Sequence, residues 1–348
     1  MSKKIIEIRH HLSDGCCMWN GIEDLYVTKS GEDVPEAFFF ALSSYGENVY
    51  LKSRNPARPV MLSVCDGRTK KTYEKIKDEL GLQYKISEGR TLEYAFRSVK
   101  REIDKGCPVI LGPLDMYHLP YLKMYHKCHI PMHYVLMVGY DEERIYLYDC
   151  GRADIQTLLY EELQKAWQIE KNTVGDQNGF IRFSLPDQLP DAFELAKACL
   201  QRKAQEQLRE KPGFVGVSAI RKIALDFPGW KENMPEDVWK NALIGLVEFW
   251  GMVPKVPNRL LGIQSDEDIC YQGNCDRLGN VLIWLGNQYK SKNWADAGCL
   301  FVQAGEVFEK ITSHIVGCLC DGEETLELIP ALFFEIADLE ERAYRRLL

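Results

Sequence analysis

The sequence predicts an α/β (α+β) domain over residues 1–186, followed by an all-helical domain over residues 190–348. Three observations support this division. Short apolar strand-like runs alternate with amphipathic helical runs up to Leu185. The segment Pro186-Asp187-Gln188-Leu189-Pro190 then combines two prolines with polar residues, which is typical of a domain boundary. Beyond it, almost every hydrophobic pattern repeats with helical spacing.

The composition excludes several classes of protein. Apolar residues make up 46% of the 348 residues, which is enough for a sizeable core in about two domains. The formal charge of −8 argues against nucleic acid as a partner, because no basic surplus is present to neutralise phosphates. No signal-like segment and no apolar run of about 18 residues occurs, so we expect a cytoplasmic protein without a membrane span. The twelve cysteines are scattered, and disulfides are not expected in a reducing cytosol.

Each element predicted in the N-terminal domain has a local signal. Trp19, Ile22, Leu25 and Tyr26 recur at about 3.6-residue spacing, which predicts a helix from Cys16-Cys17 to Gly31. The run at 91–105 is amphipathic and ends before Gly106, which is typical of a helix with a glycine C-cap. The other predicted elements are helices at 35–45, 70–80 and 160–169, and strands at 5–8, 49–52, 60–64, 108–111 and 180–185.

Three apolar stripes predict long helices in the C-terminal domain. One runs from Leu278 to Tyr289 and another from Leu332 to Ala343. The clearest consists of Trp294, Ala297, Phe301, Ala304, Phe308, Ile311 and Ile315.

A predicted β-hairpin brings together two residues with catalytic chemistry. The apolar runs Tyr134–Val138 and Ile145–Tyr148 flank a turn, which is the pattern of two antiparallel strands. His133 stands at the start of the first run and Asp149 at the end of the second. These ends lie side by side in an antiparallel hairpin, so an imidazole and a carboxylate are expected to meet. Such a pair requires a nucleophile to complete a catalytic triad.

The preferred nucleophile is Cys17, with Cys16 as the alternative. A cysteine at a helix N-terminus lies near the positive end of the helix dipole, which stabilises its thiolate. Cys17 is preferred because Ile22 and Leu25, five and eight residues later, lie on the predicted buried face. The order of cysteine, histidine and acid along the chain is that of papain-like enzymes.

The catalytic hypothesis also requires donors for an oxyanion. The Cys17 backbone N–H is one candidate, and His11 and Asp14 in the preceding loop are candidates for the other. Further candidates to line the cleft come from an aromatic, histidine-rich segment before the hairpin: Asp115, Tyr117 and His129.

Several motifs resemble the N-terminal domain of the butirosin-biosynthesis protein H family. They are the early cysteine helix, Gly106-Cys-Pro-Val-Ile110, Asp115-x-Tyr-x-Leu-Pro-Tyr121, His126, His129 and His133-Tyr-Val-x-x-Val-Gly-Tyr-Asp141. The helical half resembles the domain of unknown function that often follows it, through Gly273-Asn-Cys-Asp-Arg-Leu278 and Trp294. The resemblance covers nearly the whole chain. It implies a papain-like cysteine-peptidase fold, related to the double-glycine peptidases that trim bacteriocin leaders.

The resemblance also implies an activity. The family's named member moves an amino-acyl group from an acyl carrier protein to an amine of an aminoglycoside. Cys17 matches the cysteine of the family's early His-Cys motif, with Cys16 in place of the histidine. His133 and Asp149 match its histidine and acid. We therefore expect a bacterial acyltransferase of secondary metabolism whose partners are a small-molecule amine or amide and an acyl carrier protein, without a cofactor.

Three other interpretations remain. With water as the acceptor, the same residues would make an amidase, a peptidase or a thioester hydrolase. A papain-like module would alternatively bind a ligand without turnover. His129 and His133 have zinc-ligand spacing, but Pro131 disfavours the helix that would align them. The pairs Cys270/Cys275 and Cys318/Cys320 lack C-x-x-C spacing, so no metal site is predicted.

Overall fold

The computed structural model describes residues 3–13, 17–43, 47–64, 69–249, 274–322 and 325–348. The chain divides into two compact units. Unit 1 comprises Met1–Phe39 and Gly67–Leu195, and unit 2 comprises Phe40–Asp66 and Ala196–Leu348. The boundary between the two units therefore lies beyond Pro190. Residues 40–66 belong to the helical unit, whereas the sequence analysis placed them in the N-terminal domain.

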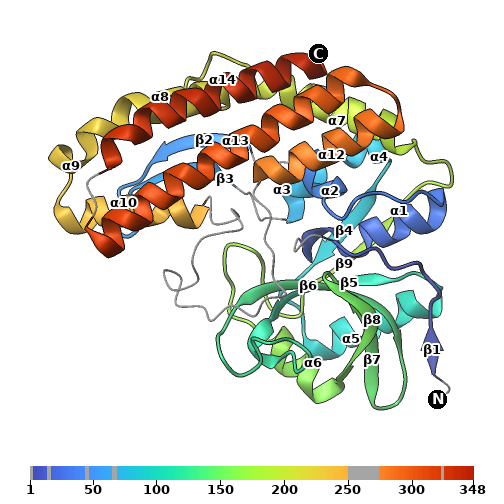
Figure 1. Cartoon of the computed structure of the whole chain (residues 1–348). Coiled ribbons are helices and arrows are strands. Elements are labelled where there is room, and N and C mark those ends of the chain that lie inside the picture. Colours follow the sequence, from blue (N-terminus) through green and yellow to red (C-terminus); the bar gives the residue numbers. More distant parts are fainter. Residues whose placement is uncertain (1–2, 14–16, 44–46, 65–68, 250–273, 323–324) are drawn as a thin grey trace. The chain divides into compact units, whose positions relative to one another are not determined.

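Unit 1 is built on a seven-stranded antiparallel sheet (Figure 1). Its main path runs in the order β4-β9-β5-β6-β7-β8, and β1 pairs with β6. The strands are β1 (Lys4–Ile5), β4 (Gln83–Ser87), β5 (Val109–Asp115), β6 (Pro131–Tyr140), β7 (Arg144–Asp149), β8 (Arg152–Leu159) and β9 (Phe180–Ser184). The sequence analysis did not predict β4 or β8, in which about half of the residues are polar and only Leu158 is buried.

The predicted hairpin is confirmed as β6 and β7. Leu136 pairs with Tyr148 and Met137 with Leu147, and the register then shifts before Gly139. A side chain at Gly139 would clash with the backbone oxygen of Lys4, so glycine permits β1 to lie alongside β6. β6 begins two residues before His133, so the histidine lies inside the strand rather than at its first position.

Two helices cover one face of this sheet. They are α5 (Leu92–Asp104) and α6 (Tyr160–Trp167) (Figure 1). Thr91 caps α5 by accepting a hydrogen bond from the Tyr94 amide, and a glycine follows the helix at 106 as predicted. The shared core consists of alternate strand residues and helix residues, including Ala95, Val99, Ile103, Val109, Leu111, Val135, Met137, Ile145, Leu147, Leu158, Leu163, Ala166 and Trp167.

The helix predicted to begin at Cys16-Cys17 is divided in the structure. Cys17 starts a three-residue 3₁₀ turn, η1 (Cys17–Trp19), and the α-helix α1 (Ile22–Ser30) begins only after Gly21. Gly21 has a φ of 87°, and a Cβ there would lie 2.6 Å from Leu136 Cδ1. Close packing on the sheet therefore requires a glycine in a left-handed conformation, which interrupts the helix. The predicted end of the helix at Gly31 is confirmed.

The remaining short helices of this part of the chain are α2 (Phe38–Leu42), α3 (Thr69–Glu74) and α4 (Lys77–Leu80). The helix predicted at 35–45 is shorter than expected, and positions 44 and 45 lie outside the described residues. The helix predicted at 70–80 is split into α3 and α4, and its predicted stop at Gly81 is confirmed.

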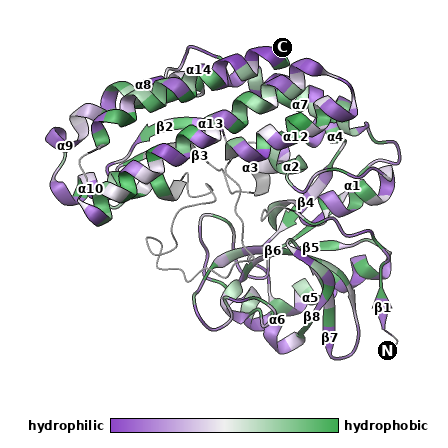
Figure 2. Ribbon diagram, in the orientation of Figure 1, coloured by the Kyte–Doolittle hydropathy of each residue, from purple (hydrophilic) through white to green (hydrophobic). Residues whose placement is uncertain are grey.

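Unit 2 is mainly helical. Its two strands, β2 (Glu47–Lys52) and β3 (Val60–Val64), pair antiparallel, as the two predicted runs suggested, and contact α8 and α10. Hydrophobic and hydrophilic residues alternate along α13 and α14 (Figure 2), as the predicted stripes require. The long helices are α7 (Ala192–Gln207, which begins in unit 1), α8 (Val217–Asp226), α10 (Glu236–Phe249), α12 (Asn274–Gln288), α13 (Lys292–Val316) and α14 (Ile329–Leu347), with the short α9 (Trp230–Asn233).

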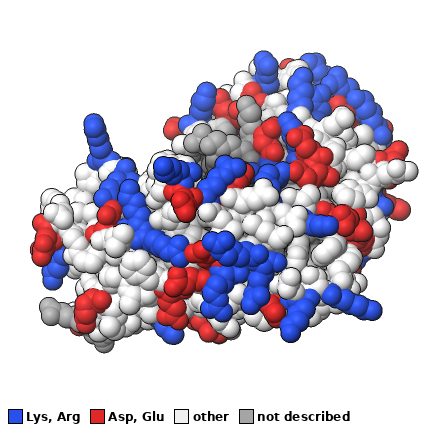
Figure 3. Space-filling model, turned by 90° about the horizontal axis from the view of Figure 1, so that it is seen from above, with Lys and Arg blue, Asp and Glu red and all other residues white. Residues whose placement is uncertain are grey.

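The surface carries mixed charge, and the helices of the described ranges are too short or too polar to span a membrane. Lys and Arg side chains lie beside Asp and Glu side chains over the face in Figure 3. Within the described ranges, no helix combines the length and apolar character needed to cross a bilayer.

Candidate active site

The β6–β7 hairpin joins His133 to Asp149. His133 Nε2 lies 2.9 Å from Asp149 Oδ1 and 2.8 Å from Asp149 Oδ2. The two side chains are only 9% and 1% exposed. A buried imidazole with one ring nitrogen held by a carboxylate has a fixed orientation, and its Nδ1 is left to face a second partner.

Cys17 is that second partner. Burial lowers the pKa of His133, but Asp149 and then Cys17 raise it well above its ordinary value through charge and hydrogen bonding. Cys17 Sγ also lies 4.0 Å from the carbonyl oxygen of Met132, the residue before His133. The cysteine is partly exposed. The structure thus brings together the cysteine, histidine and aspartate that the sequence singled out, with the imidazole between the other two.

Three hydrogen bonds hold the turn that carries Cys17. The Tyr73 hydroxyl donates to the Met18 carbonyl at 2.6 Å, and Asn20 Nδ2 donates to the Tyr134 carbonyl at 2.8 Å. The Gly21 amide donates to Asp24 Oδ2 at 2.7 Å. The bond from Asn20 ties the cysteine turn directly to the residue after His133, so the thiol and the imidazole share one rigid support.

Stabilisation of a Cys17 thiolate would come from the His133 imidazole, because no helix dipole acts on this cysteine. The expectation that Cys17 begins an α-helix is wrong, because η1 has only three residues and α1 starts at Ile22. A turn of that length has too few aligned peptide units to give an appreciable dipole.

His11 is engaged elsewhere. Its Nδ1 lies 2.8 Å from Glu23 Oε2, and its Nε2 lies 2.8 Å from the Val34 carbonyl oxygen. Burial lowers the pKa of His11, but Glu23 outweighs this and raises it to about 9. Both ring nitrogens thus have partners, and the structure does not bring them to the thiol. Asp14 and Cys16 lie outside the described residues, so the second oxyanion donor stays a prediction.

The other three cleft candidates form one cluster between β5 and β6. Asp115 Oδ1 accepts hydrogen bonds from the Tyr117 amide at 3.1 Å and the Ile130 amide at 2.9 Å. Asp115 Oδ2 lies 2.6 Å from His129 Nδ1, and the Tyr117 ring stacks on His129 at 4.0 Å. Burial raises the pKa of Asp115, but the bonds from His129 and the two amides lower it below its usual range. The sheet register places Asp115 opposite Pro131, two residues before His133.

The zinc pair considered from sequence is separated in the structure. His129 contacts Asp115, whereas His133 contacts Asp149. Among the residues that the structure describes, the group whose ligand atoms could share an ion is Asp115, His118 and His129.

Two residues that the sequence analysis did not single out support Asp149. His10 Nδ1 lies 2.6 Å from Asp24 Oδ1, its Nε2 lies 3.0 Å from the Arg152 carbonyl oxygen, and its ring stacks on Tyr148 at 4.4 Å. Burial lowers the pKa of His10, and Asp24 more than offsets this. Burial, followed by the Asp149 carboxylate nearby, raises the pKa of Tyr121. No local sequence pattern distinguishes His10 from the adjacent His11.

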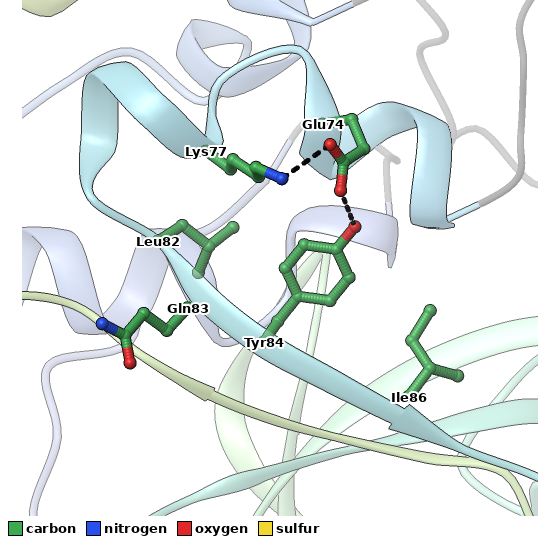
Figure 4. Close-up of a pocket in the computed structure, with 6 residues that line it drawn as sticks. All are labelled: Glu74, Lys77, Leu82, Gln83, Tyr84 and Ile86. Carbon is green, nitrogen blue, oxygen red and sulfur yellow. Dashed lines mark hydrogen bonds and ion pairs between the residues drawn. The ribbon is translucent and has the colours of Figure 1, made fainter.

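A recess of about 560 Å³ lies over β4, α3 and α4, and it contains none of these residues. Figure 4 shows Lys77 and Tyr84 directed at Glu74. Lys77 Nζ and the Tyr84 hydroxyl each lie 2.8 Å from a Glu74 carboxylate oxygen. Glu74, Lys77 and Tyr84 thus bond to one another in this recess. The nucleophile and the general base of the catalytic hypothesis lie at His133 instead.

Comparison with known families identifies the segment that carries the site. Residues 16–150 match the family model described as butirosin biosynthesis protein H, N-terminal. This segment therefore resembles the N-terminal domain of that family. The resemblance proposed from the motifs is confirmed over these residues, and the matched range encloses Cys17, His133 and Asp149. The match suggests an acyltransferase-like role in secondary metabolism.

One curated relative aligns with this chain over a segment about as long as the family match. The uncharacterized protein YobF of Bacillus subtilis (strain 168) is 30% identical over 141 residues, which is 37% of this chain and 46% of the relative. The chain therefore spans about half the length of the curated relative it matches. The resemblance of the helical half to a domain of unknown function stays a prediction.

Proposed function

We propose that the chain is a cysteine-dependent acyltransferase with a papain-like fold in unit 1. In this proposal Cys17 is the nucleophile, His133 the general base and acid, and Asp149 the group that orients the imidazole. The acyl donor is a thioester on an acyl carrier protein, and the acceptor is an amine of a small molecule. The activity belongs to bacterial secondary metabolism, in agreement with the family that matches residues 16–150.

One observation carries this proposal. His133 is buried between the Asp149 carboxylate and the Cys17 thiol, and their combined effect raises the pKa of His133 well above its ordinary value. A buried histidine with a raised pKa is suited to accept the proton of a nearby thiol as a general base. The thiolate formed in this way is the active form of a cysteine nucleophile.

The reaction would proceed in two steps. The Cys17 thiolate attacks the thioester carbonyl, and the carrier thiolate leaves with the proton held on His133 Nδ1. The acceptor amine then attacks the acyl-enzyme carbonyl and gives a proton to His133, and Cys17 leaves as a thiolate. Asp149 stays ionised throughout and holds the protonated imidazole through Nε2. The net result is one thioester bond broken and one amide bond formed.

The charge of the chain favours a cationic acceptor. The formal net charge is −8, which attracts protonated amines at long range. The same net charge does not suit an acidic carrier protein, and Lys and Arg lie among Asp and Glu over the face in Figure 3. The donor and acceptor classes therefore rest on the family match, because charge does not decide them.

Trapping of the acyl-enzyme tests the proposal. The full chain is mixed with aminoacyl thioesters of pantetheine, which mimic the arm of a carrier protein, and is quenched in acid before peptide mass analysis. We expect an acyl adduct on the peptide that contains Cys17, its absence in Cys17→Ala, and its persistence in Cys16→Ala. An adduct that survives Cys17→Ala, or that disappears in Cys16→Ala alone, would overturn the assignment of the nucleophile.

Addition of acceptors then distinguishes transfer from hydrolysis. Amines of several classes, including an aminoglycoside, are added to the preformed acyl-enzyme. Faster loss of the adduct together with an amide product supports a transferase. Loss at the same rate with and without every amine, with only free acid formed, would identify a hydrolase that uses the same three residues.

A further inference from the structure

The segment between β5 and β6 gathers three side chains with metal-binding atoms. Asp115 ends β5, His118 closes the 3₁₀ turn η2 (Met116–His118), and His129 lies two residues before β6. One ligand atom from each residue lies within 4.8 Å of the others. Atoms at such separations can converge on one ion after small side-chain rotations, because metal–nitrogen and metal–oxygen bonds are about 2.0–2.2 Å long.

The carboxylate at the base of this cluster is fixed before any ion binds. Asp115 is 8% exposed, and its Oδ1 is held by the Tyr117 and Ile130 amides. Its Oδ2 is thereby directed at His129. The cost of ordering the carboxylate is already met by the fold, which favours binding.

The imidazoles are also arranged for access. The His129 side chain is 65% exposed, so an ion can reach it from solvent. Its ring is stacked on Tyr117 at 4.0 Å, and the His118 and His129 ring centroids lie 6.1 Å apart at an interplanar angle of 66°. Two imidazoles bound to one ion have their rings at about this separation and inclined to each other.

We propose that Asp115, His118 and His129 form a binding site for a zinc-like divalent transition metal. Two imidazole nitrogens and one carboxylate oxygen are a ligand set typical of zinc with an open fourth position for water. The ion takes the place of the hydrogen bond between His129 Nδ1 and Asp115 Oδ2, and the neutral imidazole keeps its one proton on Nε2. Its effect is to join the start and the end of the segment that leads into the strand of His133.

Cobalt and zinc titrations test this site in the full chain. Co²⁺ bound to nitrogen and oxygen ligands gives visible d–d absorption without the near-ultraviolet charge-transfer band of a thiolate ligand. Isothermal titration with Zn²⁺ measures affinity and stoichiometry. Both are performed with Cys17→Ala protein, so that the partly exposed thiol beside His133 does not compete for the metal.

Two ligand variants and one control define the outcome. We expect one equivalent of tightly bound metal, and a loss of affinity of at least about 100-fold in His118→Ala and in His129→Ala, which exceeds the effect of losing an outer-shell partner. His126→Asn is the matched control, because His126 is exposed in the same segment and has a positive φ of 54° that asparagine tolerates.

A second measurement separates metal binding from misfolding. Zinc should raise the midpoint of thermal unfolding of the parent and the control, and should leave the midpoint of both ligand variants unchanged. The metal-free midpoints of the parent, the control and His118→Ala should lie close together, and that of His129→Ala should be slightly lower, because His129 contacts Asp115 and Tyr117. Equal affinity in the parent and both ligand variants, a thiolate band with Co²⁺, or no binding at millimolar zinc would each overturn the proposal.

Discussion

Two cysteines of this protein lie near buried carboxyl groups, and their surroundings give the thiols opposite chemistry. In unit 1 the His133 imidazole interacts with both Cys17 and Asp149. In unit 2 the Cys275 Sγ lies 3.6 Å from Glu340 Oε1 without an imidazole between them. Burial, followed by Glu340 and Asp276, raises the pKa of Cys275 well above its ordinary value.

The difference shows what the histidine contributes. A carboxylate beside a thiol opposes its ionisation, because the two negative charges repel. Burial raises the pKa of Glu340 to about 8, so this carboxyl keeps its proton near neutrality, and Asn48 Nδ2 donates to its other oxygen at 2.7 Å. When an imidazole stands between thiol and carboxylate, the carboxylate stabilises a cation that in turn stabilises the thiolate. Unit 2 therefore has a packed polar pair, and unit 1 has a candidate catalytic centre.

Removal of the imidazole should have the largest effect on activity. His133→Ala should lower kcat/KM for thioester consumption by about 10⁴-fold, because the thiol loses both its base and its counter-ion. Cys275→Ala in unit 2 should change it by less than about two-fold, because the polar partner of this thiol is Glu340 of unit 2. Steady-state assays of both variants make the test, and equal losses would show that the two thiols were wrongly distinguished.

Changes at Asp149 should have a smaller effect. Asp149→Ala and Asp149→Asn should each lower kcat/KM by roughly 10²–10³-fold, because neither side chain carries the charge that stabilises the imidazolium. Asp149 raises the pKa of His133, so both changes should lower that pKa and reduce the thiolate–imidazolium form near neutral pH. The dependence of kcat/KM on pH measures this. Wild-type kcat/KM in both variants would contradict an orienting role.

Substitution of Glu340 should affect stability and leave the chemistry unchanged. The folded-state pKa of Glu340 is raised from 4.5 to about 8, so the folded protein holds a proton that the unfolded chain releases between these pH values. The protonated Glu340 therefore stabilises the folded protein fully below the unfolded pKa, and this stabilisation is lost as pH rises through the folded pKa. The total loss is a few kcal/mol, because one pKa unit corresponds to about 1.4 kcal/mol.

Glu340→Gln isolates this contribution, because glutamine has the same shape and does not titrate. The free energy of unfolding of the wild-type protein relative to the variant should decrease between pH 5 and pH 8.5 or so. Chemical denaturation at several pH values measures the difference. A difference that does not change with pH would mean that the carboxyl is not protonated in the folded protein.

Local sequence signals predicted the parts of the site that depend on neighbouring residues. The apolar runs around a turn gave the β6–β7 hairpin, and the positions of His133 and Asp149 at its ends followed from antiparallel pairing. The order of Cys17, His133 and Asp149 along the chain suggested the third member. These predictions needed only the strand period and the chemistry of the side chains.

The features that were not predicted depend on contacts between distant segments. Gly21 interrupts the cysteine helix because a side chain there would meet Leu136, which no local pattern reveals. Residues 40–66 group with unit 2 because β2 and β3 contact its helices. His10 supports the turn after β7 through Arg152, and the Asp115 cluster closes only when β5 and β6 pair.

The rate of alkylation of individual cysteines tests the central claim most directly. Iodoacetamide is applied to the native protein at several pH values, and each cysteine is followed by peptide mass analysis. Near neutral pH, Cys17 should react about ten-fold faster than the exposed Cys107, with little dependence on pH, and Cys275 should barely react. In His133→Ala, the rate at Cys17 should fall to that of Cys107 and rise with pH. A Cys17 that follows Cys107 in the wild-type protein would contradict an activated thiolate.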